Sequence, residues 1–273
     1  MGKLYLVATP IGNLEDITLR ALRILREVPL IAAEDTRHTR KLLARYEITT
    51  PTISYHEHNK QERERELMEA LVSSDVALVS DAGTPALSDP GYELVQAAIR
   101  KGVEVVPIPG PAAPIAALIA SGLPTDAFLF LGYIPRKAAE RHALFADLLT
   151  ERRTAILFEV PHRVQATLNE MQEVLGGDRL MAAARELTKV HEQILRGSIA
   201  DVRAQLASGP AKGEFTLLIG PAPQEQVWSE ARVRDHLEAA INEGLSRSAA
   251  ARKVAQESGW SKNDVYRLGL EGT

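Results

Sequence analysis

Two acidic loops follow one short apolar run in the first half of the chain. Residues 76–79 are apolar and β-branched, and they lead directly into SDAGTP (80–85) and SDPG (88–91). A strand that ends in Asp, Gly and Pro before a helical segment is typical of an open α/β sheet, where ligands bind beyond the strand ends. We therefore expect Asp81 to face a ligand crevice, with Gly83 allowing close backbone approach. Residues 88–91 are expected to cap a helix over 92–100.

Two further polar loops follow apolar runs. EDTRHTRK (34–41) offers Asp35 as a candidate acid and Arg37 among cations that could bind phosphate, although a solvated helix start explains it equally well. HEHN (56–59) follows a strand expected over 52–55, and its two histidines would share one face if that strand continued. Because no third ligand is evident, a polar strand end near the cleft is favoured over a metal site.

Three segments of similar design indicate that the loops share one crevice. LYLVATPIGNL (4–14), residues 76–91 and VEVVPIPGPAA (103–113) each read as a strand that ends in a Pro/Gly loop. Amphipathic helical patterns separate them, which predicts an open α/β sheet. The apolar, alanine-rich segment that reaches residue 121 should be buried against the sheet or a partner subunit.

The second half of the chain also alternates helices with strands, which are expected over 128–134, 154–158, 179–184, 192–196 and 214–220. Several of these strands are adjacent, so a mixed sheet is predicted. Glu159 follows the second of them, and Arg185 and Lys189 follow the third.

Two breaks in the pattern predict the domain organisation. GLPTD (122–126) and PAPQEQ (221–226) divide the chain into α/β domains over 1–121 and 122–223 and a helical domain over 224–273. The last domain has helix-turn-helix spacing, and Trp260 and Tyr266 are expected in its core. Its second half is basic, through Arg247, Arg252, Lys253, Lys262 and Arg267. RNA docking and a packing or dimerisation role both fit that pattern.

Composition excludes several classes of site. The 273 residues include no cysteine, which excludes disulfides, iron–sulfur clusters and cysteine nucleophiles and is consistent with a cytoplasmic location. We expect no membrane span and no cleavable signal peptide, because no long apolar run is present and MGKLYLV leads straight into a strand. The net charge of −4 does not indicate nucleic-acid binding, and dinucleotide, P-loop and nucleophile-elbow motifs are absent.

Long collinear motifs resemble one known family. VATPIGNL, AAEDTRHTRKLL, SYHEHN, SDAGTPALSDPG, PIPGPAA, FEVPHR and RELTKVHE resemble the tetrapyrrole-methylase superfamily, most closely its branch that methylates small-subunit ribosomal RNA. The resemblance implies two α/β domains with S-adenosylmethionine between them, a small all-α C-terminal domain and a homodimer. It also implies methyl transfer to the 2′-hydroxyl of a cytidine in the decoding region of 16S ribosomal RNA in the 30S subunit, without a metal.

Positions at strand ends, together with the same resemblance, predict roles for residues. Glu159 and Lys189 are the catalytic candidates, because a ribose hydroxyl needs a base or a cation near the developing alkoxide; Asp35 and Arg185 remain alternatives. The cofactor is expected to contact Pro10, Asp81, Gly83, Thr84, Ala112, Ala113, Phe158, Ala184 and Thr216. The substrate is expected to contact Asp35, Arg37, His56, His58, Asn59, Arg163 and Arg185.

Two positions depart from the family pattern, and two other functions remain as alternatives. Ala112 and Val160 stand where the family often has serine, so a side-chain hydroxyl contact is missing at each. Relatives with this fold methylate corrin precursors or a modified histidine of a protein. Outside enzymes, the alternative is an RNA-binding assembly factor. The basic loop 37–41 and the C-terminal helices favour RNA over a macrocycle.

Overall fold

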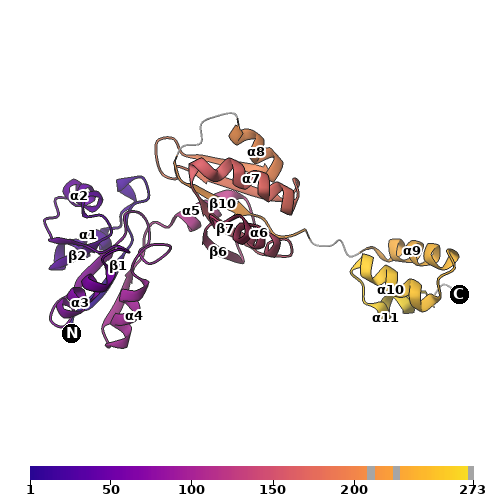
Figure 1. The fold of residues 1–273 in the computed structure, drawn as a ribbon, viewed down its shortest axis with the longest axis horizontal. Helices are drawn as coiled ribbons and strands as arrows, with labels where there is room; N and C mark the ends of the chain where they lie inside the picture. The colour runs from indigo at the N-terminus through magenta and orange to yellow at the C-terminus, as the bar shows by residue number, and fades with distance from the viewer. Residues whose placement is uncertain (208–212, 224–227, 270–273) are drawn as a thin grey trace. The chain divides into compact units, whose positions relative to one another are not determined.

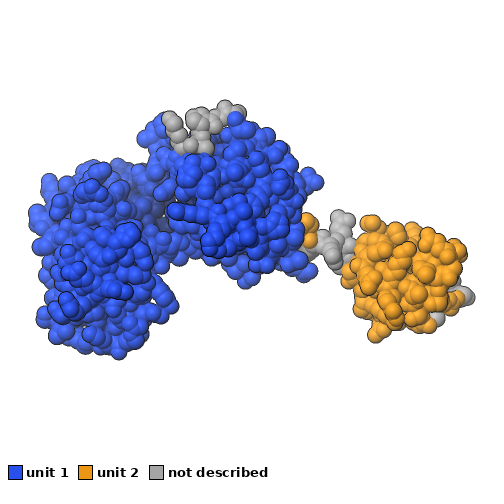
Figure 2. All heavy atoms as spheres, viewed as in Figure 1, with its two compact units in different colours: residues 1–220 blue, residues 221–273 orange. Residues whose placement is uncertain are grey.

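The computed structural model describes residues 1–207, 213–223 and 228–269, and the chain separates into two compact units, residues 1–220 and 221–273 (Figures 1 and 2). The first unit contains two five-stranded sheets, which confirms the predicted α/β class. The predicted division of this unit at residue 121 stays a prediction. The expected linker residues 224–226 lie outside the described part of the chain. Among the described residues, no helix is both long and apolar enough to cross a membrane.

The first sheet is parallel throughout, in the order β3-β2-β4-β1-β5 (Thr52–Ser54, Leu30–Ala33, Val76–Val79, Lys3–Val7 and Glu104–Ile108). Successive side chains of a strand point to opposite faces. Leu78 therefore packs with helices α3 (Lys60–Ala70) and α4 (Tyr92–Arg100), and Val79 with α1 (Leu19–Glu27) and α2 (Thr36–Arg45). Burial on both faces explains why β2 and β4 are continuous apolar runs. A short 3-10 helix, η1 (Leu14–Asp16), precedes α1.

The second sheet is mixed, as the sequence predicted, in the order β6-β7-β10-β8-β9. Strand β6 (Phe128–Tyr133) is parallel to β7 (Thr154–Glu159). The other pairs are antiparallel and involve β10 (Phe215–Ile219), β8 (Leu180–Arg185) and β9 (Gln193–Ser198). One core cluster joins this sheet to helices α6 (Ala138–Asp147), α7 (Pro161–Leu175) and α8 (Ile199–Ala207).

Helix α5 (Ala113–Ser121) follows the last strand of the first sheet but packs on the second sheet (Figure 1). Its Ala117 and Leu118 share a core cluster with Ile156 of β7 and Leu218 of β10. The lack of charge in this segment predicted burial, and the second sheet is the surface that provides it. One continuous piece of chain thus links the two sheets.

The C-terminal unit contains helices α9 (Glu230–Asn242), α10 (Arg247–Ser258) and α11 (Lys262–Leu268). A serine precedes each helix, and its side chain accepts a hydrogen bond from the N–H three residues later, which caps the helix start. Trp260 packs against the core of this unit, as expected. The predicted core position of Tyr266 is wrong: its side chain is 41% exposed, because Val265 and Leu268 occupy the buried side of α11.

Candidate functional site

The carboxyl ends of the first sheet open onto a cavity of about 270 Å³. One wall comes from the loops after β1, β2, β4 and β5 and the start of α5. The other wall comes from the ends of β6 and β7, the start of β10 and the loop 186–189. The position beyond the carboxyl ends of parallel strands is where open α/β sheets bind ligands.

Backbone groups around Gly83 build the first wall. Thr9 and Gly83 exchange two backbone hydrogen bonds, of 2.8 and 3.0 Å, which join the loops after β1 and β4. The hydroxyl of Thr84 donates to the carbonyl of Pro111 at 3.2 Å and so adds the loop after β5. The three Pro/Gly loops therefore meet, as the sequence predicted. Gly83 has a φ of +83°, and a Cβ there would lie 3.3 Å from Cγ2 of Ile11.

Backbone strain lies on both walls. Ala86, Ser88, Glu186 and Thr188 are not glycines, yet their φ angles are 67°, 64°, 50° and 64°. A residue held in the left-handed region costs about 1–3 kcal/mol and persists where the surrounding structure imposes it, often at a ligand site. Ser88 and Glu186 line the cavity. This clustering favours a ligand site over a plain connection between elements.

Carboxylates dominate the charged lining of the cavity, which includes Glu34, Asp81, Asp89, Glu159, Glu186 and Glu214 beside the ammonium of Lys189. Burial, followed by repulsion from Glu34, raises the pKa of Asp89 to about 7. Burial also raises the pKa of Glu34, although its hydrogen bond from the Asp81 N–H acts in the opposite direction. A cation bound here would relieve the repulsion, so the cavity suits a positively charged ligand.

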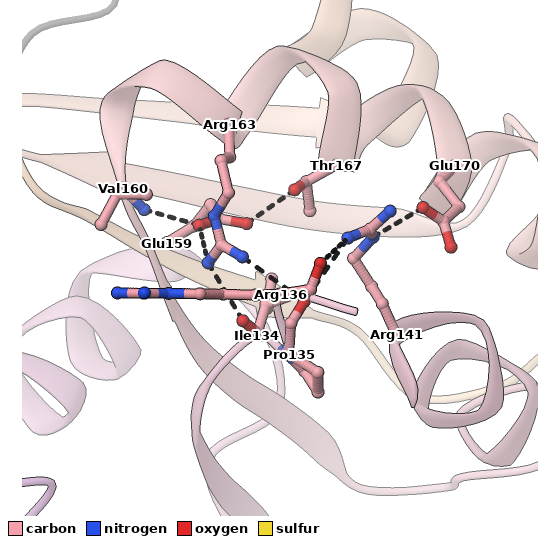
Figure 3. A network of polar contacts seen from close by, with 9 residues as sticks. All are labelled: Ile134, Pro135, Arg136, Arg141, Glu159, Val160, Arg163, Thr167 and Glu170. Atoms are coloured by element: carbon pink, nitrogen blue, oxygen red, sulfur yellow. Dashed lines mark hydrogen bonds and ion pairs between the residues drawn. The ribbon is translucent and has the colours of Figure 1, made fainter. Parts of the chain in front are cut away.

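Glu159 is a lining residue whose carboxylate is held on both oxygens (Figure 3). Its Oε1 accepts a hydrogen bond from the Val160 N–H at 2.7 Å and lies 2.6 Å from Nη2 of Arg163. Its Oε2 accepts from the hydroxyl of Thr167 at 2.6 Å. The residue is 1% exposed. This geometry favours a role in fixing the start of α7, and the catalytic role of Glu159 stays a prediction.

Lys189 lies on the same wall as Glu159, where its Nζ is 2.9 Å from Oε1 of Glu186. Gly12 allows its loop to pack closely against the loop after β1, because a Cβ there would lie 2.7 Å from the Leu187 carbonyl oxygen. The ammonium is therefore held at the cavity and can offset negative charge that develops there. Its catalytic role also stays a prediction.

The cavity brings together most of the predicted cofactor and catalytic residues, namely Asp81, Gly83, Thr84, Ala112, Ala113, Phe158, Glu159, Lys189 and Thr216. Pro10 and Ala184 do not line it: both are buried, and Ala184 belongs to the core cluster under α5. Their predicted contacts remain untested.

The predicted substrate residues lie outside the cavity lining. Asp35 caps α2 by accepting from the Arg37 N–H at 2.8 Å, and hydrogen bonds from Arg37 lower the pKa of Asp35 to about 2. Asn59 accepts from the His56 N–H at 2.8 Å, and the rings of His56 and His58 are 6.0 Å apart.

The other two predicted substrate residues, Arg163 and Arg185, have different surroundings. Arg163 holds Glu159, and Arg185 is half-buried at the end of β8. Within the described residues, no group of three or more histidines or carboxylates could hold a metal ion. The substrate roles stay predictions.

Several titratable lining residues were not singled out from the sequence: Glu34, Asp89, Tyr133, Glu186 and Glu214. Asp89 was assigned only to a capping loop, whereas the N-cap of α4 is Gly91, without a side-chain hydrogen bond. The repeated Ser-Asp pair before each Pro/Gly turn was a signal that could have found it. Tyr133 ends β6 and Glu214 precedes β10, and no local pattern shows which strand ends meet across a cleft.

Comparisons with known proteins agree with this arrangement. The family model described as Tetrapyrrole (Corrin/Porphyrin) Methylases matches residues 3–203. The chain is 51% identical to a Synechocystis sp. protein named Ribosomal RNA small subunit methyltransferase I, over 99% of this chain and 98% of that protein. It is 45% identical to the Halalkalibacterium halodurans protein of the same name, over 98% and 94%.

A solved structure has a similar fold. It is uroporphyrin-III C-methyl transferase from Thermus thermophilus complexed with S-adenyl homocysteine, with a TM-score of 0.56 and 21% identity. The match covers 80% of this chain and 97% of that one.

Proposed function

The chain belongs to the tetrapyrrole (corrin/porphyrin) methylase family and is a methyltransferase; we propose that it transfers the methyl of S-adenosylmethionine to a cytidine ribose 2′-hydroxyl in 16S ribosomal RNA. The observation that carries this proposal is the extent of the matches. The relatives named for ribosomal RNA methylation match 98–99% of the chain, whereas the uroporphyrin enzyme matches 80%. The C-terminal unit is therefore shared with the RNA methyltransferases, which favours an RNA acceptor.

The lining of the cavity fits the cofactor. S-adenosylmethionine carries a sulfonium and an ammonium, and it supplies a methyl group already activated for transfer. The carboxylates of Glu34 and Asp81 complement the positive charges. Gly83 and Ala112 leave backbone groups accessible, as binding of an adenosine portion requires. Phe158 adds an apolar aromatic surface to the opposite wall.

The protein's own residues then have two tasks: to orient the ribose hydroxyl and to accept its proton. Orientation alone can supply about 7–11 kcal/mol of a barrier when the reacting atoms are well aligned. Asp89 is suited to proton acceptance, because its carboxyl has a pKa of about 7, close to neutral pH. The ammonium of Lys189 can stabilise the developing alkoxide.

We extend the proposal to a homodimer that acts on the 30S subunit in the cytoplasm, where ribosomes are assembled. Large apolar side chains are exposed on α5, where Ile115 and Ile119 are 44% and 75% exposed. The edge strand β6 exposes Phe128 and Leu131. Exposed apolar surface of this kind favours a contact with another protein surface.

A methyl-transfer assay tests the proposed function. The protein is incubated with labelled S-adenosylmethionine and small ribosomal subunits that lack the modification, and the labelled nucleotide is mapped. Label on a cytidine ribose of 16S RNA is the expected result. Label on a base, on ribosomal protein or only on an added tetrapyrrole would contradict the proposal that a cytidine ribose is the acceptor. Cofactor binding without any transfer would favour an assembly factor.

A further inference from the structure

Two internal arginines hold one short segment at the end of β6. We define the clamped segment as residues 134–136, which follow the cavity residue Tyr133. Arg163 donates to the carbonyls of Ile134 at 3.0 Å and Pro135 at 3.4 Å. Arg141 donates to the carbonyls of Pro135 at 3.5 Å and Arg136 at 3.2 Å. All three carbonyls of the segment thus accept hydrogen bonds from guanidinium groups (Figure 3).

Each clamping arginine is itself paired with a carboxylate. Glu159 lies 2.6 Å from Nη2 of Arg163, and Glu170 lies 2.6 Å from Nε of Arg141. The four side chains are at most 20% exposed. Pairs as buried as these contribute little net stability, because desolvation offsets their attraction. Their clearer effect is positional: they fix where the clamped segment lies.

The clamped segment presents one cation to solvent. The side chain of Arg136 is exposed, and in Figure 3 it extends away from Arg141. Within residues 1–207, 213–223 and 228–269, its guanidinium has no hydrogen bond or ion pair. The neighbouring Lys137 differs, because it pairs with Glu140 at 2.9 Å. The clamp therefore holds the backbone of an arginine whose side chain remains available.

Arg136 stands close to the cavity along the chain. It is the third residue after Tyr133, a span of at most about 10 Å. Strands β6 and β7 are parallel, so the clamped segment lies at the same edge of the sheet as Glu159, which lines the cavity. The lining is rich in carboxylates and would repel a phosphate, so an RNA acceptor needs a cation beside the cavity.

We propose that Arg136 binds a phosphate of the RNA substrate and that the two partly buried arginine–carboxylate pairs position it. The inference rests on the proposed function, since it concerns the same RNA. A planar guanidinium forms two parallel hydrogen bonds to a phosphate, so a fixed arginine sets both the place and the direction of the backbone. Glu159 then contributes to RNA binding as a positioning residue, through Arg163 and the clamped segment.

Substitution of Arg136 tests the contact, with Arg152 as the matched control. Arg152 is also exposed, but it precedes β7, at the end of the strand opposite Glu159. With undermethylated small subunits as the probe, Arg136→Ala should raise KM for subunits about tenfold. The slope of log KM against log salt should decrease by about one, because one phosphate contact is lost. The affinity for S-adenosylmethionine and kcat should match the parent, and Arg152→Ala should change nothing.

A double substitution tests the positioning. Arg141→Met leaves Arg136 present but releases one clamp, and it should raise KM for subunits about threefold. The Arg136→Ala, Arg141→Met protein should be no worse than Arg136→Ala alone, because both changes remove the same contact. If the two substitutions raise KM for subunits additively, the positioning role of Arg141 is overturned.

Other results would overturn the phosphate contact. These are parent-like KM and salt dependence in Arg136→Ala, or a loss of cofactor affinity in place of RNA affinity. If the unsubstituted protein leaves small-subunit RNA unmethylated, the proposed function itself fails, which is a separate outcome.

Discussion

The carboxylate of Glu34 accepts a hydrogen bond from the backbone N–H of Asp81 at 3.2 Å. The carboxylate of Asp81 accepts one in return from the N–H of Asp35, the residue after Glu34, at 2.9 Å. The ends of β2 and β4 are therefore tied by two acidic side chains that repel each other. This arrangement places negative charge on the cavity wall, where a cationic cofactor would offset it.

Removal of the Asp81 charge should weaken the cofactor site. Asp81→Asn keeps an oxygen for the Asp35 N–H but loses the charge, so we expect about tenfold weaker S-adenosylmethionine binding, or about 1.4 kcal/mol. The control is Asp75→Asn, since Asp75 precedes β4 and accepts the Lys3 N–H at 2.8 Å, away from the cavity. Calorimetric affinities that are equal in the two variants would contradict the assignment.

Filling the space beside Gly83 should abolish cofactor binding. A valine there would crowd Ile11 and also strain a backbone with a φ of +83°. Gly102→Val separates the two effects, because Gly102 has a φ of +74° but no atom lies within 4 Å of the point where its Cβ would stand. Both variants should lose about 1–2 kcal/mol of stability through the backbone. Only Gly83→Val should lose cofactor affinity, and calorimetry that finds both affinities intact would reject this prediction.

The carboxyl of Asp89 should give activity and stability opposite dependences on pH. As a proton acceptor with a pKa of about 7, it should make the single-turnover rate rise from pH 6 to pH 8. The folded-state pKa lies above the unfolded value of about 3.9, so the folded state binds more protons between those values. The free energy of unfolding should therefore fall as pH rises from about 4 to about 7.

The variant Asp89→Asn should remove both dependences on pH. Its single-turnover rate should be low and flat across pH 6–8, and its free energy of unfolding should no longer fall over the acidic window. A variant that retains the parental rate profile would exclude Asp89 as the proton acceptor.

The two predicted catalytic residues should respond differently to substitution. Glu159→Gln leaves Arg163 without its buried partner and should cost about 3 kcal/mol of stability, measured by urea denaturation. Glu104→Gln is the control, because its pair with Lys3 is exposed and contributes little to stability. Lys189→Met should instead lower the single-turnover rate about tenfold with stability nearly unchanged. Parental rates in both variants would mean that neither residue serves catalysis.

Removal of the C-terminal unit should weaken RNA binding and leave the affinity for the cofactor unchanged. A chain that ends at Pro223 keeps the whole cavity, so its affinity for S-adenosylmethionine should match the full chain. Its KM for small subunits should rise and depend less on salt, because Arg247, Arg252 and Lys262 are lost as possible phosphate contacts. If methylation is unchanged across a salt series, dimerisation becomes the role to test, by sedimentation.

The parts of the site that the sequence could predict are those marked by residue types within a short stretch of chain. Strand ends were found where Asp, Gly or Pro interrupts an apolar run, so the loops around Asp81 and Ala112 were placed correctly at one crevice. The opposite wall depends on how the second sheet approaches the first, which no local pattern encodes. Phe158 and Thr216 came only from the family resemblance, and Glu214 was missed.

Side-chain function was harder to predict than position. Glu159 follows a strand and lines the cavity, as a catalytic acid would, yet Thr167 and Arg163 hold its oxygens. Those partners lie on the next helix, within two turns of Glu159, so their spacing was visible in the sequence. That they converge on one carboxylate depends on how α7 leaves β7.

Helix α5 connects the lining of the cavity to the core of the second sheet. Ala112 and Ala113 line the cavity, while the rest of the helix is anchored on Ile156 and Leu218 of the second sheet. A change in that packing would therefore shift Ala112 and Ala113, so the shape of the cavity depends on the core of the second sheet.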